Sequence, residues 1–307
     1  MKEKIKTFLC VLVLLCALPY IITMCFDRSD REDGNSDAVI DLPGSTDADG
    51  AADNTEDLEE YLIGVVAEQI PMNYETEALK AQAVIARTNL LAAREKGEEL
   101  PEGISRDELL KLWGKEDFGN NYQKLVNAVK DTEGVVLTYQ GSYIYAAFHA
   151  VSAGRTRSAA EALGNDKLPW LESVESDSDI SSEAYLKVVF LEKTDFTARL
   201  TAAFSGLALD GEKPLDSIVV SVRDSAGYVT ELKNGEETVN GEEFRNALGL
   251  SSACFYLKEV EGKIRIVTKG LVHGLGLSQY GANELAKKGT DYPEILSFYF
   301  KNIEISD

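Results

Sequence analysis

The sequence has few of the residues that most metal, redox and nucleic-acid functions require. It contains two histidines and four cysteines, and 31 Lys and Arg residues against 52 Asp and Glu residues, for a net charge of -21. So acidic a chain argues against a nucleic-acid-binding role, because such proteins need basic patches to neutralise phosphates. Neither a GxxxxGK[ST] nor a GxGxxG pattern is present, so nucleotide chemistry has no support.

The distribution of the cysteines excludes a disulfide framework in the main part of the chain. Three of the four lie in the apolar run "FLCVLVLLCALPYIITMCF", residues 8–26, and only Cys254 lies beyond it. A run of about 19 uncharged residues can span a bilayer as a helix. Lysines precede this run and acids follow it, which favours a cytoplasmic N-terminus. A cleaved signal peptide is the alternative, although the run has no A-x-A-like processing site.

These features predict four regions. Residues 1–7 are expected in the cytoplasm, residues 8–26 form a single-pass membrane anchor, and residues 27–56 are an acidic linker too poor in apolar residues to fold. Residues 57–307 are expected to be an extracytoplasmic domain. The protein would therefore be located in the cell membrane.

The pattern after residue 57 predicts an α+β fold with helices first, a strand-rich middle and helices again at the C-terminal end, arranged around one cleft. An amphipathic helix begins near Asp57, and a second, capped by Asn73, reaches Lys96. A third covers residues 106–130, with interruptions at Gly114 and Gly119. The rest of the prediction is a hairpin turning at Gln140-Gly141, strands at 186–191, 217–222, 229–232 and 255–269, and helices over 278–289 and 292–300.

A carboxylate near the end of the first predicted helix is the strongest candidate for chemistry. Glu68 lies at the border of the apolar face, two residues before Ile70-Pro71, where the helix is expected to end. Partial burial and the carbonyl end of a helix both disfavour a charged carboxylate, so both raise its pKa. A carboxyl group that keeps its proton near neutral pH can act as a general acid. The alternative is an ordinary solvated glutamate.

Both histidines lie in loops rich in small residues. His149 opens "HAVSAGRT" and His273 opens "HGLGLSQYGA", in which Ser278 is expected to cap the following helix. Free backbone N–H groups at that helix start could hold a polar or anionic ligand group. Each histidine could instead be structural. A metal site built from Glu68, His149 and His273 would depend on the fold, and since the chain has no HExxH motif and no paired cysteines, we predict no metal and no cofactor.

Three quoted stretches together resemble one family. "GVVAEQIP" followed by "EALKAQAVIARTNLLA", "FHAVSAGRT" followed by "PWLESVESDSD", and "HGLGLSQYGANELAKKGTDYPEILSFYF" are similar to the successive motifs of the stage II sporulation protein D family. The resemblance runs in order from about Leu58 to Phe300. It implies a membrane-anchored peptidoglycan lytic transglycosylase that leaves 1,6-anhydro-MurNAc ends, acting on glycan strands stripped of stem peptides during engulfment of the forespore, beside a partner amidase. The anchor would then lie in the mother-cell membrane facing the forespore.

The resemblance also assigns residues. The family's catalytic glutamate matches Glu68, and motif matching implies that the cleft is lined by Arg87, His149, Ser152, Thr156, His273, Ser278, Gln279 and Tyr280. Such an enzyme needs a single acid/base carboxylate, whereas a glycoside hydrolase normally needs two. Asn89 and Ala153 depart from the family pattern, which usually has an aromatic residue and a glycine there. A glycan-binding amidase enhancer without turnover and a metal-dependent hydrolase are the alternative functions.

Overall fold

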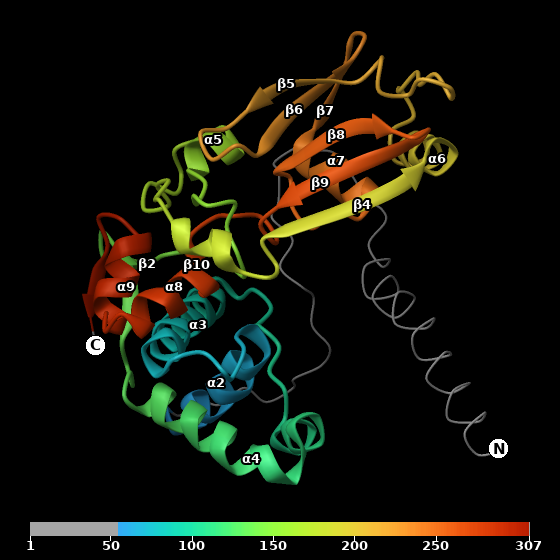
Figure 1. Cartoon of the computed structure of the whole chain (residues 1–307). Coiled ribbons are helices and arrows are strands. Elements are labelled where there is room, and N and C mark those ends of the chain that lie inside the picture. The colour runs from blue at the N-terminus through green and yellow to red at the C-terminus, as the bar shows by residue number, and fades with distance from the viewer. Residues whose placement is uncertain (1–54, 307) are drawn as a thin grey trace, which may run out of the picture. The chain divides into compact units, whose positions relative to one another are not determined.

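The computed structural model describes residues 55–306, and the predicted anchor and nearly all of the predicted linker lie outside this range (Figure 1). Within the described residues, helices precede a strand-rich middle, and two more helices follow, so the predicted α+β class is confirmed. None of the helices between residues 55 and 306 is both long enough and apolar enough to cross a membrane.

Three helices open the described part of the chain. They are α2 (Thr55–Gln69), α3 (Thr76–Lys96) and α4 (Arg106–Lys130), and each contacts the other two. Their apolar faces enclose a core that includes Leu62, Val65, Leu79, Leu90 and Leu125. The helical spacing of apolar residues after residue 57 therefore marked a buried face, as predicted.

The helix ends differ from the prediction in detail. Glu75, not Asn73, is the N-cap residue of α3, while the predicted end at Lys96 is confirmed, with Gly97 in a left-handed conformation after it. In α4 the backbone leaves helical geometry at Gly114 (φ 72°), whereas the helix continues through Gly119. Glycine lowers helix propensity at both positions, but only the tertiary environment decides which of them breaks the helix.

Small sheets and short helices surround α3. The hairpin β1 (Val136–Tyr139) and β2 (Ser142–Tyr143) turns at Gln140-Gly141 as predicted, and β11 (Glu304–Ser306) pairs with β1 on its other side. The helices α8 (Gln279–Lys287) and α9 (Tyr292–Tyr299) also contact α3. Segments from both ends of the described chain therefore meet on this helix.

The strand-rich middle contains two antiparallel sheets. One has the order β4 (Leu186–Glu192), β9 (Lys263–Lys269), β8 (Phe255–Val260), and the other has the order β5 (Val219–Arg223), β6 (Val229–Asn234), β7 (Glu237–Asn240). Two helices absent from the prediction, α6 (Lys193–Ala203) and α7 (Gly241–Leu248), pack with them. Their core includes Phe196, Leu200, Phe244, Phe255 and Ile264.

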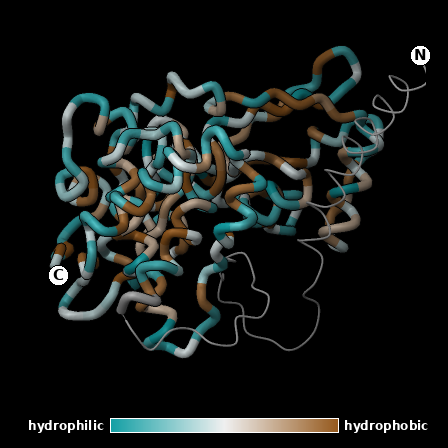
Figure 2. The backbone as a smooth tube through the Cα atoms, turned by 90° about the horizontal axis from the view of Figure 1, so that it is seen from below, coloured by the Kyte–Doolittle hydropathy of each residue, from teal (hydrophilic) through white to brown (hydrophobic). Residues whose placement is uncertain are grey.

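Three short elements link the helical and strand-rich parts of the sequence. They are β3 (Phe148–His149), α5 (Ala159–Leu163) and the 3-10 helix η1 (Asp177–Ser181), with β10 (Leu277–Ser278) returning to them later in the chain. In Figure 2, many of the outer loops are coloured as hydrophilic, and many of the segments between these loops are coloured as hydrophobic.

Candidate active site

Backbone pairing brings the second and third sequence motifs together. The strands β3 and β10 run parallel, with Phe148 opposite Leu277 and His149 opposite Ser278. Gly276 precedes this pairing with φ 70°, and a side chain there would overlap the carbonyl oxygen of Ala147. Glycine is required because no other residue combines this backbone conformation with so close an approach.

Hydrogen bonds among three glutamines connect these strands to the first motif. The Gln279 side-chain amide donates to the carbonyl oxygen of Gln69 at 2.6 Å and to Oε1 of Gln82 at 3.1 Å, and Gln82 donates to Oε1 of Gln69 at 2.8 Å. Gln69 is the last residue of α2, so its carbonyl is one that the helix leaves without an internal partner. Gln279 thus fixes the end of the helix that carries Glu68.

Glu68 lies one residue before that capped end, and its side chain is exposed. It is more exposed than a position at the border of a buried face implies. Its pKa is nevertheless raised, first by the partial desolvation of the carboxyl group and then by the negative charge of Glu102. The predicted direction of the pKa shift is confirmed, but the contribution of Glu102 was not foreseen. The result is an accessible carboxyl group that holds its proton to a higher pH than a fully solvated glutamate does.

Most of the residues assigned to the cleft by resemblance have buried side chains. Six of them are at most 4% exposed: Arg87, His149, Ser152, Thr156, Ser278 and Gln279. His273 and Tyr280 are half-buried. The six buried side chains are therefore placed to hold the loops in position, whereas Glu68, His273 and Tyr280 retain a surface that a ligand can reach.

Arg87 is a motif residue that stabilises the core through an ion pair and hydrogen bonds. Its guanidinium makes a bidentate ion pair with Glu59, with both N···O distances 2.7 Å, and donates further to the carbonyl oxygens of Val129 and Val135. These contacts join α2, α3 and the end of α4. The side chain is 1% exposed. Arg87 is therefore part of the core beneath the site and does not reach its surface.

Asp179, the last residue of "PWLESVESDSD", is a buried acid that the sequence analysis did not single out. Its Oδ2 accepts a 2.8 Å hydrogen bond from the backbone N–H of Ser152, and Ser152 in turn accepts from the N–H of Gly154. Burial raises the pKa of Asp179, while the hydroxyls of Ser152, Ser278 and Ser176 act in the opposite direction. The serines of the two loops thus surround one carboxyl group, and its burial inside "PWLESVESDSD" carries no local sequence signal.

The two histidines lie next to each other, with ring centroids 5.9 Å apart. Nδ1 of His149 donates to the carbonyl oxygen of Leu275 at 2.9 Å, and Nδ1 of His273 accepts from the N–H of the same residue at 3.0 Å. Burial lowers the pKa of His149 to about 4 and that of His273 to about 3, and the proximity of His149 contributes to the second shift. Both rings are neutral at physiological pH.

These histidines do not assemble a metal site with Glu68. Among residues 55–306, no three His, Cys, Asp or Glu side chains are grouped so that they could hold a metal ion. One nitrogen of each ring is already engaged by the Leu275 backbone. The geometry gives the metal-dependent hydrolase no support.

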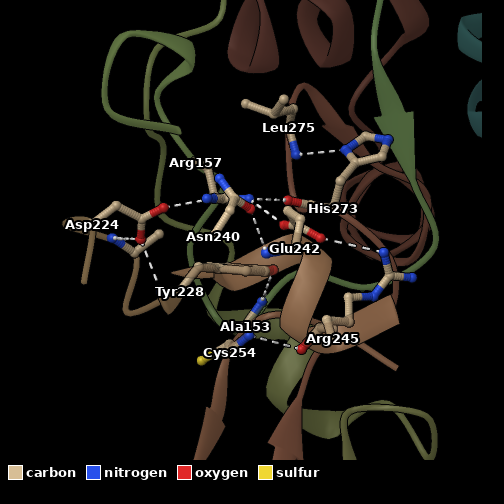
Figure 3. Close-up of polar contacts among 12 residues, drawn as sticks. Ala153, Arg157, Asp224, Tyr228, Asn240, Glu242, Arg245, Cys254, His273 and Leu275 are labelled. Atoms are coloured by element: carbon tan, nitrogen blue, oxygen red, sulfur yellow. Dashed lines mark hydrogen bonds and ion pairs between the residues drawn. The ribbon is translucent and has the colours of Figure 1, made fainter. Parts of the chain in front are cut away.

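Arg157, one residue after the second motif, connects the site loops to the strand-rich part (Figure 3). Its guanidinium contacts Asp224 at 2.6 Å and Glu242 at 2.7 Å, donates to the carbonyl oxygen of His273 at 3.2 Å and lies over the ring of Tyr228. The sequence analysis missed this residue because its partners lie 67 or more positions away. The loop that carries His273 is therefore held by a buried ionic cluster.

One of the two departures from the family pattern, Asn89, has a clear local role. The Asn89 side chain donates to the carbonyl oxygen of Ala146 at 3.0 Å and accepts from its N–H at 2.9 Å, so it clamps the segment before β3. The N–H of Ala153 donates to the hydroxyl of Tyr228 at 3.2 Å. Asn89 therefore positions the segment before His149 with its side chain, whereas the contact of Ala153 uses only its backbone N–H, which a glycine would also supply.

Comparison with known proteins identifies relatives of this chain among sporulation proteins. A family model described as "Stage II sporulation protein" matches residues 49–139. The stage II sporulation protein D of Bacillus amyloliquefaciens is 33% identical over 97% of this chain and 94% of its own length. That of Bacillus subtilis (strain 168) is 36% identical over 81% of this chain and 74% of its own length.

A more distant relative carries a different name. The chain is 27% identical to the "Amidase enhancer" of Bacillus subtilis (strain 168), over 78% of this chain but only 39% of that protein. The similarity to the Bacillus amyloliquefaciens protein covers nearly all of both chains. This chain belongs to the stage II sporulation protein D family.

Proposed function

We propose that this protein is a lytic transglycosylase that cleaves the MurNAc–GlcNAc bond of peptidoglycan strands free of stem peptides. The observation that carries the proposal is Glu68, an accessible carboxyl group with a raised pKa where the three motifs meet. A carboxyl group tuned in this way supplies the proton that departure of a sugar oxygen requires.

Glu68 would act twice in this reaction. It first donates its proton to the bridging oxygen, which takes the electrons of its bond to C1 of MurNAc as that bond breaks and leaves as a hydroxyl group of GlcNAc. The resulting carboxylate then accepts the proton of the C6 hydroxyl of MurNAc while that oxygen bonds to C1 and closes the 1,6-anhydro ring. No water enters, and Glu68 ends the cycle protonated.

The proposed setting of the reaction rests on the family and on the N-terminal sequence. Residues 8–26 would anchor the protein in the mother-cell membrane facing the forespore, with residues 57–307 as the extracytoplasmic catalytic domain. A peptidoglycan amidase is the proposed partner, since a relative is named amidase enhancer and amidases remove stem peptides.

A glycan-binding amidase enhancer without turnover is the second candidate. Burial of six of the nine motif residues supports it, because few exposed motif groups besides Glu68 are then available to assist a reaction. The two candidates differ in whether Glu68 transfers a proton.

Mass spectrometry of the products separates the candidates. Full-length protein in detergent is incubated with glycan strands stripped of stem peptides, and the new chain ends are identified. Anhydro ends support the transglycosylase, reducing ends identify a hydrolase, and intact strands that co-sediment with the protein identify a binder. EDTA in a parallel sample should leave the rate unchanged, because the residues proposed for the reaction include no metal ligand set.

A further inference from the structure

The two faces of the β4-β9-β8 sheet differ in exposure. One face belongs to the core that α6 and α7 help to form. On the other face, four large apolar side chains are between 40% and 53% exposed: Leu186, Val188, Phe190 and Tyr256. Clustered, exposed apolar side chains on a folded domain mark a surface that binds another molecule.

The register of the sheet places these side chains together. Val188 on β4 lies opposite Val267 on β9, which lies opposite Tyr256 on β8, so the three form one row across the sheet. Leu186 and Phe190 are two positions to either side of Val188, and side chains two apart on a strand point the same way. The apolar patch therefore lies on a single face.

The same face is basic, although the whole chain has a net charge of -21. The register puts four cations on it, namely Lys258, Lys263, Arg265 and Lys269. Glu192 is the one acidic side chain on this face of the three strands, and it is paired with Lys263. The other three cations form no ion pair with any residue in the range 55–306. We call the four apolar residues and these three cations the basic sheet face.

The aromatic ring of Tyr256 is already covered by cations. The Arg223 guanidinium lies 4.5 Å from the ring centroid and Nζ of Lys269 lies 5.4 Å from it. Arg223 is held in place because it donates to the carbonyl oxygens of Gly227 and Phe255, both at 2.8 Å. A sugar stacks on a free aromatic ring, and this one is occupied. The composition of the face, aliphatic side chains beside cations, instead suits a lipid surface.

We propose that the basic sheet face docks the protein onto a membrane surface rich in anionic lipid. Lys258, Arg265 and Lys269 contact the lipid phosphates, to which cations near the surface are attracted. The apolar side chains of β4 enter the boundary between headgroups and acyl chains. This role goes beyond the proposed reaction and does not depend on Glu68.

The proposed anchor brings such a surface within reach. Residues 27–54 separate the predicted span from the first described residue. A flexible linker of this length has an average end-to-end distance of about 30 Å. A tethered domain meets the membrane at high effective concentration, so contacts that are weak in free solution are sufficient for docking.

The test places a fluorescent probe on the face. Full-length Phe190→Trp is reconstituted into vesicles of phosphatidylglycerol and phosphatidylcholine whose acyl chains carry bromine, which quenches tryptophan in the apolar layer. Wild type, with Trp113 and Trp170, gives the background. Leu112→Trp is the matched control, because Leu112 is an apolar residue of α4 that is 65% exposed. Val188→Trp is a second probe of the same face.

We expect quenching of Phe190→Trp and Val188→Trp above the background in anionic vesicles, and quenching at background level in vesicles of phosphatidylcholine alone. Leu112→Trp should stay at background in both. Each cation near an anionic surface should change the docking equilibrium about fivefold, so adding Lys258→Gln and Arg265→Gln to the probe variant should weaken docking about 25-fold. Lys111→Gln with Lys115→Gln, which removes two exposed cations of α4, should leave the quenching unchanged.

Several outcomes would overturn the proposal. Quenching of both face probes that does not exceed that of Leu112→Trp excludes contact with lipid, and equal quenching in anionic and neutral vesicles excludes the role of the cations. If Lys258→Gln with Arg265→Gln weakens glycan co-sedimentation in detergent but leaves lipid quenching intact, the face binds glycan instead. We expect this double variant to cleave glycan in detergent at the wild-type rate, so the test of docking is separate from the test of Glu68.

Discussion

Glu68 is the residue on which the proposed reaction depends, and it is also one that the fold can lose without damage. Its side chain is exposed, and no core contact rests on it. Substitution at this position therefore separates chemistry from folding more cleanly than substitution at the buried motif residues does.

Glu68→Gln should lower the rate of glycan cleavage by about 10²–10⁴-fold or more, because glutamine preserves the shape but cannot transfer a proton. Glycan co-sedimentation and the thermal melting temperature should stay close to wild type. Glu60→Gln, an exposed change on the same helix, is the control and should retain full activity. An unchanged cleavage rate in Glu68→Gln would remove this residue from the mechanism.

Arg87 shows the opposite case, a motif residue used for stability. Removing one partner of a buried ion pair leaves an uncompensated charge, which typically costs about 3–5 kcal/mol. Arg87→Met should lower the free energy of unfolding in urea by that amount, since Glu59 loses both its hydrogen bonds. Arg155→Met breaks an exposed pair with Glu175 and should cost less than about 1 kcal/mol. Equal effects of the two changes would contradict the buried role.

At the scale of elements, short strands rather than long ones assemble the site. The pairing of β3 with β10 involves two residues on each strand, yet it aligns the loops of both histidines. So short a pairing has little stability of its own, and it depends on the close approach at Gly276 and on the Gln279 contacts to α2.

Substitution by alanine should change the stability of the fold in opposite directions at two of the glycines. Gly276→Ala introduces an overlap with the Ala147 carbonyl and a strained positive φ, so we expect destabilisation of more than about 2 kcal/mol and loss of site geometry. Gly119→Ala lies in the continuous part of α4 with nothing within 4 Å of the added carbon, and should stabilise the fold by about 0.5–1 kcal/mol. Urea unfolding curves of both variants measure the contrast.

At the scale of the whole molecule, the two neutral histidines make stability depend on pH. The folded state lowers the pKa of His149 to about 4 and that of His273 to about 3, so it favours their neutral forms. This contribution is complete above the unfolded pKa near 6.5 and is lost as the pH falls towards the folded values. Asp179, whose pKa is raised by burial, acts in the opposite direction.

The effect of His149 can be isolated with His149→Asn, which keeps a donor for the Leu275 carbonyl but cannot be protonated. The free energy of unfolding of wild type is compared with that of the variant at pH 7.5 and 4.5. Wild type should lose about 2–3 kcal/mol relative to the variant over this range. A difference that stays constant with pH would show that His149 is not buried as a neutral ring.

The sequence by itself determined what depends on near neighbours in the chain. The apolar spacing of α2, the hairpin turn at Gln140-Gly141 and the Ser278 cap of α8 were all predicted, because each follows from contacts between residues a few positions apart. The pKa direction of Glu68 was predicted for the same reason. The boundaries were less certain, as the cap at Glu75 in place of Asn73 shows.

Only the tertiary structure decided which motif residues face solvent. Arg87 reads like a site residue, but Glu59, 28 positions away, holds it in the core, and Gln279 is occupied by a helix end 210 positions away. The segment before α4 lies against α2 only because Gly64 and Gly103 let the two backbones approach closely. Burial and long-range hydrogen bonds depend on how distant segments pack, and no local pattern in the chain encodes that packing.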